Sequence, residues 1–294
     1  MNTLLRSVMF VPGQDIGLLR KAITSEADAL IPDLEDSVQP NELKQVARAN
    51  ILSLAKDGSF IGRKIFPRLN DRDSGFLLRD VFDLTVEGIT GFVYPKAESA
   101  GDIVFIDKLL TCLELERGHE VGKFKLIPLI ETTNAILNVH EICRASHRII
   151  AIAFGCEDFL TDLGGDKGEH FITLHTPRAN IAMAAKAAGI VAIDTVHVNV
   201  HDLDDLEKNL KIAKSFGFEG MLVLHPKELE LVHKYFSPTP DEVAHSRLIL
   251  ELAQDAERDG KGVAILNGKF VGPPFIAKAK KVLNRHELIE GTKK

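Results

Sequence analysis

The sequence has little cysteine, no excess of basic charge and no long apolar run, and each absence excludes a class of protein. Its 294 residues include three cysteines, Cys112, Cys143 and Cys156, which form no CxxC pair and no zinc-ligand spacing. We therefore expect buried, reduced thiols. Lysine and arginine total 36 against 42 aspartate and glutamate residues. This balance argues against binding to nucleic acid.

The N-terminal residues carry no membrane or export signal. They read MNTLLRSVMFVPG, in which Arg6 interrupts a short apolar stretch before Pro12 and Gly13. Neither a signal peptide nor a membrane span fits this pattern, so we expect a cytoplasmic protein with no membrane partner. With 45% apolar and 27% charged residues, the chain is typical of one large globular domain or a barrel with a short appendage.

Short apolar runs alternate with longer amphipathic segments as far as about Leu231, which is typical of βα units around parallel strands. Eight strands are predicted, at 7–11, 29–34, 64–69, 91–95, 125–130, 149–154, 192–198 and 221–224. Eight units favour a closed (β/α)8 TIM barrel in the α/β class. The alternative is an open doubly wound sheet, which usually carries a glycine-rich nucleotide turn after its first strand, and VPGQDIG does not match GxGxxG.

Beyond Tyr235 the pattern changes. An amphipathic helix is predicted from Asp241 to Glu257, followed by a hairpin-like stretch, VAILNGKFVG, and a basic helix from Phe275 to Leu288. We expect residues 1–234 to form the barrel and residues 235–294 to form a C-terminal helical and hairpin segment that lids a barrel mouth. Its lysines either meet an anionic ligand or form a solvated face; they are Lys269, Lys278, Lys280 and Lys281.

Polar residues follow most of the predicted strands, where barrel enzymes place their active sites. They are Asp33 to Asp36, Arg68 to Asn70, Lys96, Glu131, Glu157, Asp158, Asp194 and His225. Carboxylates that converge on one end of a barrel repel one another unless a cation or protons intervene. Oxygen ligands without a His or Cys cluster favour Mg²⁺ or Mn²⁺. Glu131 and Asp158 occupy equivalent positions on adjacent strands, so both could reach one ion, or each could cap a helix or pair with a lysine.

Three other side chains leave two interpretations open. Arg68 either stabilises an enolate or binds a carboxylate, or it forms an ion pair with the acidic residues 33–36. Lys96 either acts as the nucleophile of a Schiff-base aldolase or faces a loop, as the surrounding PKAES favours. His225, before Pro226, is predicted to be a packed imidazole at a strand end rather than a metal ligand, because no second His lies at ligand spacing.

The order of these segments resembles the citrate lyase β-subunit-like family, which is related to malyl-CoA and citramalyl-CoA lyases. The resemblance runs almost end to end, through RSVMFVPG, ADALIPDLEDSV, FPRLN, GFVYPKAES, LIPLIETTNAILNVHEI, AIAFGCEDF, PRANIAMAAKAAGIVAIDTVHVNV and NGKFVGPPFIAKAKKVL. It implies a barrel in a homo-oligomer, a trimer or hexamer, in which the C-terminal segment lids a neighbouring active site. It also implies Mg²⁺ as the cofactor and coenzyme A as part of the substrate.

The resemblance also assigns roles to individual residues. Glu131 and Asp158 match the family's Mg²⁺ ligands, Arg68 matches its substrate-binding arginine, and Glu35 and Asp36 match outer-shell groups that hold metal waters or orient Arg68. One position departs from the family. Where many members have a tail aspartate assigned to proton transfer, this chain has Gly272.

The implied reaction is cleavage of a 3-hydroxy-acid thioester, namely citramalyl-CoA, malyl-CoA or a citryl thioester, into a 2-oxo acid and an acetyl thioester. With Gly272 in the tail, the base would be a metal-bound hydroxide or Asp36. Two alternatives are a non-catalytic structural subunit, assembled with the α and acyl-carrier subunits of a citrate lyase-type complex, and the Lys96 aldolase. Gly272 favours the structural subunit, whereas intact Arg68, Glu131 and Asp158 favour the enzyme.

Overall fold

The computed structural model describes residues 3–258, 264–266 and 269–292 and divides the chain into two compact units. The first unit is Leu5–His233, and the second consists of Lys234–Lys294 together with the N-terminal residues up to Leu4. No helix among the described residues is both long enough and apolar enough to cross a membrane. The role of the second unit as a lid stays a prediction.

Seven parallel strands form the sheet of the first unit, in the spatial order β2-β1-β7-β6-β5-β4-β3. They are β1 (Ser7–Pro12), β2 (Ala29–Asp33), β3 (Gly91–Tyr94), β4 (Lys125–Ile130), β5 (Ala151–Phe154), β6 (Val191–Asp194) and β7 (Gly220–Val223). Between the edge strands β2 and β3 runs the segment 64–69, which bridges to β2 at Ile65 and Arg68 and to β3 at Arg68. The result is the predicted TIM-barrel-like fold, and the open sheet is wrong.

The segment 64–69 was predicted as a regular strand, but it pairs only through isolated bridges. Pro67 lies in its middle and has no N–H to donate to a neighbouring strand, which limits the ladder there. Its side chains nevertheless behave as those of an eighth strand, because Phe66 is buried in the barrel interior. Every other strand adds apolar side chains to the same core, for example Val8, Ile31, Val93, Ile127, Ala153, Ile193 and Leu222.

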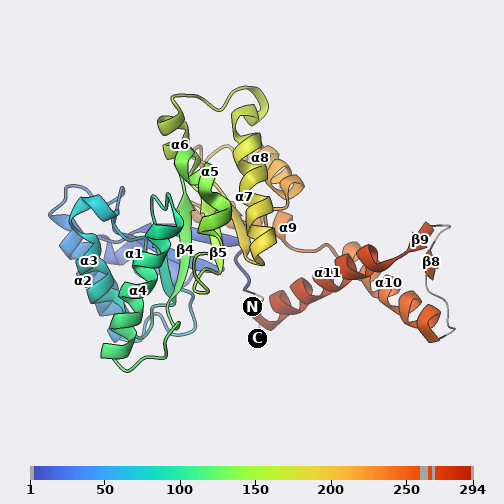
Figure 1. Ribbon diagram of the computed structural model, residues 1–294, viewed down its shortest axis with the longest axis horizontal. Coiled ribbons are helices and arrows are strands. Elements are labelled where there is room, and N and C mark those ends of the chain that lie inside the picture. The colour runs from blue at the N-terminus through green and yellow to red at the C-terminus, as the bar shows by residue number, and fades with distance from the viewer. Residues whose placement is uncertain (1–2, 259–263, 267–268, 293–294) are drawn as a thin grey trace. The chain divides into compact units, whose positions relative to one another are not determined.

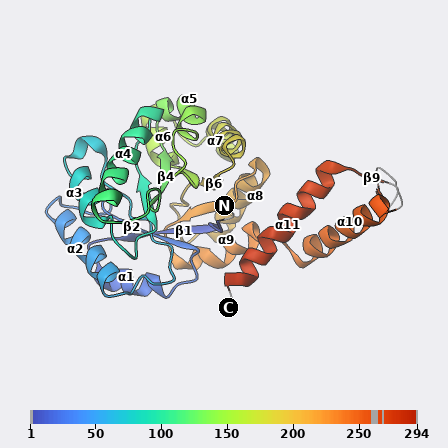
Figure 2. The same cartoon turned by 60° about the horizontal axis from the view of Figure 1, so that its bottom comes forward.

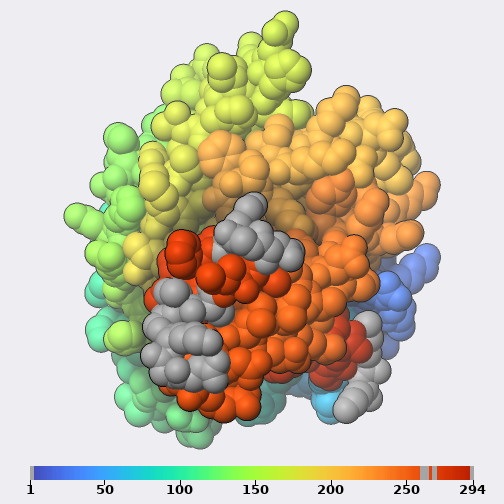
Figure 3. Space-filling view, turned by 90° about the vertical axis from the view of Figure 1, so that its right-hand side faces the viewer, coloured from blue at the N-terminus to red at the C-terminus, as the bar shows by residue number. Residues whose placement is uncertain are grey.

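Helices follow the strands and surround them, as Figures 1 and 2 show for this unit. They are α1 (Ile16–Ile23), α2 (Leu43–Lys56), α3 (Leu77–Leu84), α4 (Ala100–Glu116), α5 (Thr133–Ile142), α6 (Cys156–Leu163), α7 (His175–Ala188), α8 (Leu203–Phe216) and α9 (Leu229–Phe236), with short 3-10 turns η1 (Arg72–Ser74), η2 (Glu169–Leu174) and η3 (Pro226–Glu228). The turn η2 belongs to the loop between α6 and α7, which projects from the unit in Figure 3.

Most strands differ from the sequence prediction by one or two residues at one or both ends, and one strand ends four residues early. The strand expected over 192–198 ends at Asp194, and the residues after it form a loop. The helix α7 ends at Ala188 and is followed by Gly189. This glycine has a φ of 73°, a left-handed conformation that suits a helix C-terminus and disfavours residues with a Cβ atom.

In the second unit, α10 (Pro240–Arg258) and α11 (Pro273–Thr292) pack on one another, with Ile249, Ala256 and Ala279 buried in their shared core. The strands β8 (Ala264–Leu266) and β9 (Lys269–Val271) form an antiparallel hairpin between them. The two predicted helices and the hairpin are therefore confirmed. Gly262 and the residues 267–268 lie outside the described residues, as does the side chain of Lys269.

Candidate active site

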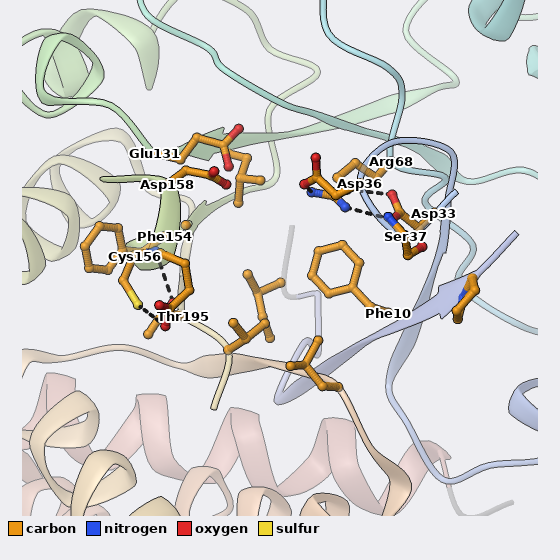
Figure 4. A pocket seen from close by; sticks show the side chains of 17 residues that line it. Phe10, Asp33, Asp36, Ser37, Arg68, Glu131, Phe154, Cys156, Asp158 and Thr195 are labelled. Atoms are coloured by element: carbon orange, nitrogen blue, oxygen red, sulfur yellow. Dashed lines mark hydrogen bonds and ion pairs between the residues drawn. The ribbon is translucent and has the colours of Figure 1, made fainter. Parts of the chain in front are cut away.

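A cavity of about 460 Å³ lies at the C-terminal ends of the barrel strands. Its polar lining consists of Asp33, Asp36, Ser37, Arg68, Glu131, Cys156, Glu157, Asp158 and Thr195, and its apolar lining of Phe10, Pro12, Leu129, Phe154, Gly155, Val196, Leu222 and Leu224. In Figure 4, Glu131 and Asp158 lie next to each other on one side of the cavity, while Arg68 and its acidic partners lie on the other. The cavity thus gathers Arg68, Glu131, Asp158 and Asp36 from the predicted site.

Arg68 is fixed by the acidic loop that follows β2. Its Nε and Nη2 atoms donate to the two carboxylate oxygens of Asp33, at 2.6 and 2.7 Å, and Nη1 donates to Asp36 Oδ2 at 2.8 Å. The same Nη1 lies 3.0 Å from Glu35 Oε2. The guanidinium also lies over the ring of Phe10, 5.0 Å from its centroid, in cation–π geometry. The ion-pair interpretation of Arg68 is therefore correct, and the same side chain also lines the cavity.

Asp33 anchors this arrangement. Besides Arg68, its carboxylate accepts hydrogen bonds from the backbone N–H of Glu35 and from both the N–H and the hydroxyl of Ser37. Burial alone would raise the pKa of Asp33, but the hydrogen bonds and charge of Arg68 outweigh it and hold the pKa below its ordinary value. Asp33 thus stays ionised and orients Arg68, a role the sequence did not single out.

Glu131 follows β4 and is 1% exposed. Its Oε1 atom accepts the backbone N–H of Lys96 at 2.7 Å, and Lys96 holds this N–H in place with a left-handed φ of 47°. On the other side, a Cβ atom at position 155 would approach Glu131 Cβ and Oε2 to 2.7 Å, so only glycine leaves room for the carboxylate. The backbone around Glu131 is therefore shaped to hold a buried carboxylate at the cavity.

Asp158 lies in the first turn of α6, directly after β5. Its side chain is exposed and forms no hydrogen bond or ion pair with another described residue. The start of α6 is held by Thr195, whose hydroxyl accepts the N–H of Cys156 at 3.2 Å. The first turn of a helix favours negatively charged side chains, and Asp158 lies there at the cavity. Asp158 is therefore available to a ligand.

Glu131 and Glu35 are the two acids of the site whose pKa values are strongly raised. Burial, then the charge of Glu35 and, more weakly, that of Asp158, raises the pKa of Glu131 well above its ordinary value. Burial, opposed by Arg68 and reinforced by Asp36, raises the pKa of Glu35 to about 7. Glu35 Oε1 is buried without a hydrogen bond and lies 4.0 Å from Lys96 Nζ. The site therefore carries more negative charge than its own cations neutralise.

Oxygen ligands of this kind suit a hard divalent cation. Glu131 and Asp158 supply two carboxylates from the segments that follow the adjacent strands β4 and β5, and no three acidic, His or Cys side chains in the described part of the chain are placed to hold a metal by themselves. An ion held here would therefore complete its coordination with waters and substrate oxygens, as Mg²⁺ commonly does. The ligand assignment itself stays a prediction.

Other residues named from the sequence lie outside this arrangement. Lys96 Nζ donates to Asp71 at 2.8 Å, and this hydrogen bond raises the pKa of Lys96, which is the opposite of what a Schiff-base nucleophile needs. Asp194 is fully buried against Arg178, at 2.9 Å. His225 caps the turn η3 by accepting the N–H of Lys227. That it is no metal ligand stays a prediction.

A buried network behind the acidic loop was not found from the sequence. Lys44 Nζ donates to the carbonyl oxygens of Leu34 and Glu35, at 3.1 and 3.0 Å, and to Asn70 Oδ1 at 2.6 Å. Asn70 in turn donates through its side chain to Asp80, which pairs with Arg48. These contacts fasten the loop that carries the partners of Arg68. The one signal for this network in the sequence is that two basic residues, Lys44 and Arg48, follow the acidic residues 33–36.

Known proteins are similar to this chain over most of its length. The citrate lyase subunit beta of Haemophilus influenzae is 36% identical, with 95% of this chain and 96% of that protein covered. The L-malyl-CoA/beta-methylmalyl-CoA lyase of Rhodobacter capsulatus is 28% identical, with 96% and 95% covered. The crystal structure of protein CitE from Mycobacterium tuberculosis, in complex with magnesium, acetoacetate and coenzyme A, is 26% identical with a TM-score of 0.75, covering 95% of this chain and 97% of that one.

A model of one protein family also matches residues 6–226, which span nearly the whole barrel unit and include every residue of the cavity. The fold, the acids at the C-terminal ends of the strands and these similarities agree, and the resemblance read from the sequence is confirmed. The chain belongs to the HpcH/HpaI aldolase/citrate lyase family.

Proposed function

We propose that this protein is a Mg²⁺-dependent carbon–carbon lyase that cleaves a 3-hydroxy-acid thioester, namely citramalyl-CoA, malyl-CoA or a citryl thioester, into a 2-oxo acid and an acetyl thioester. The observation that carries the proposal is Glu131. It is a buried carboxylate at the cavity, forms no ion pair with any described cation, and neighbours a second carboxylate, Asp158. A site of this charge requires protons or a metal ion.

Mg²⁺ fits the residues present. Glu131 and Asp158 would hold it, and Glu35, whose Oε1 accepts no hydrogen bond from the described residues, and Asp36 would hold waters of its outer shell. The magnesium in the CitE complex and the named activities of the two lyase relatives support the same assignment. When bound, Mg²⁺ would supply the Lewis acidity that lowers the pKa of a substrate hydroxyl.

Arg68 accounts for binding of the substrate's carboxylate or enolate oxygen. A guanidinium has five N–H donors, and Arg68 uses three of them in hydrogen bonds to Asp33 and Asp36. One donor remains on each Nη atom, but Glu35 Oε2 lies 3.0 Å from Nη1, so Nη2 carries the donor that is free for a carboxylate or enolate oxygen. Because Asp33 locks the orientation of the guanidinium, this donor is fixed before the substrate binds, which is how a preorganised site stabilises developing charge.

A proton acceptor is available at the same mouth. Asp36 lines the cavity, its side chain is 67% exposed, and only its Oδ2 atom is bound by Arg68. The second oxygen, Oδ1, is open to a substrate hydroxyl. Gly272 offers no side chain for this step, so we assign the proton acceptor to the barrel unit and keep Asp36 as its candidate.

The test is turnover by the purified, full-length protein with citramalyl-CoA, malyl-CoA and citryl-CoA, with Mg²⁺ and with EDTA. We expect Mg²⁺-dependent release of acetyl-CoA from at least one thioester. Asp158→Asn should abolish it, whereas Asp162→Asn, the same change one turn later on α6 and outside the cavity lining, should retain it. Absence of turnover from all three substrates would favour the non-catalytic structural subunit.

Assembly forms part of the proposal. We place the protein in the cytoplasm as a homo-oligomer, a trimer or hexamer, in which the unit containing α10 and α11 lids the barrel of a neighbouring copy. The exposed apolar residues of this unit, Ile265, Phe270 and Phe275, support such a contact. A partnership with citrate lyase α and acyl-carrier subunits is the alternative assembly, and light scattering of the isolated protein separates the two.

A further inference from the structure

We propose that the cleaved thioester carries a single carboxylate and a small alkyl group on its hydroxyl-bearing carbon. This inference rests on the proposed lyase function and narrows its substrate. The three candidates differ at this one carbon: beside the hydroxyl and a carboxylate, malyl has hydrogen, citramalyl has methyl and citryl has a second, carboxymethyl arm. The environment that the cavity offers to this third substituent therefore decides among them.

The charge of the cavity opposes a second carboxylate. Five acidic residues line it, Asp33, Asp36, Glu131, Glu157 and Asp158, whereas Arg68 is the one lysine or arginine in its lining among the described residues. Arg68, a divalent ion and Lys167, which pairs with Glu157 at 2.6 Å, would together offset four of these five charges and leave the lining negative. The first substrate carboxylate has Arg68 and the ion as partners, but a second one would enter a negative field without a cation of its own.

The remaining capacity of Arg68 leads to the same conclusion. Three of its N–H donors are committed to Asp33 and Asp36, and Glu35 Oε2 lies 3.0 Å from Nη1, so its remaining capacity matches at most one anionic group. Other nearby cations are engaged elsewhere: Lys96 Nζ donates to Asp71, and Lys44 Nζ donates to the acidic loop and Asn70. Neither of these lysines lines the cavity.

Apart from the charged residues and the side chains of Ser37, Cys156 and Thr195, the wall is apolar. Phe154, Leu129 and Leu222 line the cavity and are at most 3% exposed, and Phe10 and Val196 pack against the same barrel core. These apolar side chains gain contact with a methyl group and give a carboxylate no hydrogen-bond donor, so a carboxylate placed against them would lose its hydration without replacement. An apolar pocket discriminates one methylene by about 10- to 200-fold, and the penalty for a buried charge is larger.

The chemistry balances for this substrate. The hydroxyl proton passes to a base, the carbon–carbon bond between the hydroxyl-bearing carbon and the thioester α-carbon breaks, and its electron pair forms the thioester enolate. One proton returned to that α-carbon gives an acetyl thioester, and the other product is a 2-oxo acid with a methyl group. No oxidant or co-reactant is needed.

The test compares kcat/KM of the wild-type protein, with Mg²⁺, for the three CoA thioesters. We expect citramalyl-CoA to be the best substrate and citryl-CoA to be at least about 100-fold worse. Equal or better cleavage of citryl-CoA would overturn the inference while leaving the lyase function standing. Absence of cleavage of all three would instead overturn the proposed function, and this inference with it.

A cation added to the wall makes the test specific to the cavity. Leu224→Lys places an ammonium at the cavity lip, where Leu224 is 39% exposed. It should raise the citryl-to-citramalyl ratio of kcat/KM at least about tenfold, while Leu203→Lys, the same change at a 43% exposed position outside the lining, should leave the ratio unchanged. An unchanged ratio in Leu224→Lys would show that the wall does not select the substituent.

Discussion

Replacement of Glu35 by glutamine should change how the stability of the protein depends on pH. Glu35 is 7% exposed, and burial raises its pKa from an ordinary value of 4.5 to about 7. The folded state therefore holds a proton that the unfolded chain has already lost, and the free energy of unfolding falls as the pH rises from about 4.5 to about 7. At about 1.4 kcal/mol per pKa unit, this rise corresponds to about 3 kcal/mol.

Glutamine has nearly the same shape as glutamate and does not ionise. Glu35→Gln therefore removes the fall in free energy of unfolding between about pH 4.5 and about pH 7. Relative to wild type, the variant should gain about 3 kcal/mol in free energy of unfolding between pH 4.5 and pH 8. The assay is urea unfolding followed by far-UV circular dichroism across this range, in EDTA. The control is Glu157→Gln, which removes a carboxylate from the same cavity, with a side chain that is 46% exposed and bound to Lys167. Parallel pH profiles for wild type and Glu35→Gln, or an equal gain in the control, would refute the reasoning.

Three further predictions concern other parts of the site. Arg68→Lys should lower kcat/KM at least about tenfold, or about 1.4 kcal/mol, because an ammonium cannot bind both oxygens of Asp33 and that of Asp36 and still present a donor to the substrate; near wild-type kcat/KM would restrict Arg68 to an ion-pair role. Borohydride with substrate should leave Lys96 unmodified by mass spectrometry, since Asp71 holds its ammonium; a trapped adduct would establish the Schiff-base route. Removal of the chain from Gly262 onward should weaken thioester binding and the oligomer together, and a truncated protein with its assembly and activity intact would make the tail a passive appendage.

The fold was predictable because each strand can be recognised from its own short stretch of sequence. Buried parallel strands are apolar on both faces, and the glycine that ends α7 adopts a conformation that few other residues tolerate. The segment 64–69 shows the limit. Its apolar residues predict a strand, but Pro67 has no backbone N–H to donate. The number of hydrogen bonds that the segment makes therefore depends on both neighbouring strands.

The site was predictable in its residue types and less so in its contacts. A polar residue directly after an apolar strand falls at the barrel mouth, and this rule placed Glu131, Asp158 and Arg68 at one cavity. It does not say which acid Arg68 binds most closely, and Asp33 has that role. It also cannot reveal Gly155, whose importance depends on the space that Glu131 occupies from another strand. Such contacts arise from folding and leave no local pattern.

The central claim is that Glu131 and Asp158 hold a divalent cation, and calorimetric titration of Mg²⁺ into the metal-free protein tests it most directly. We expect one Mg²⁺ per chain for wild type and for Asp162→Asn, and a loss of binding in Glu131→Ala and Asp158→Ala. Circular dichroism should show that these two variants keep their fold, because each removes a carboxylate from a negatively charged cavity. Unchanged Mg²⁺ affinity in either alanine variant would contradict the account.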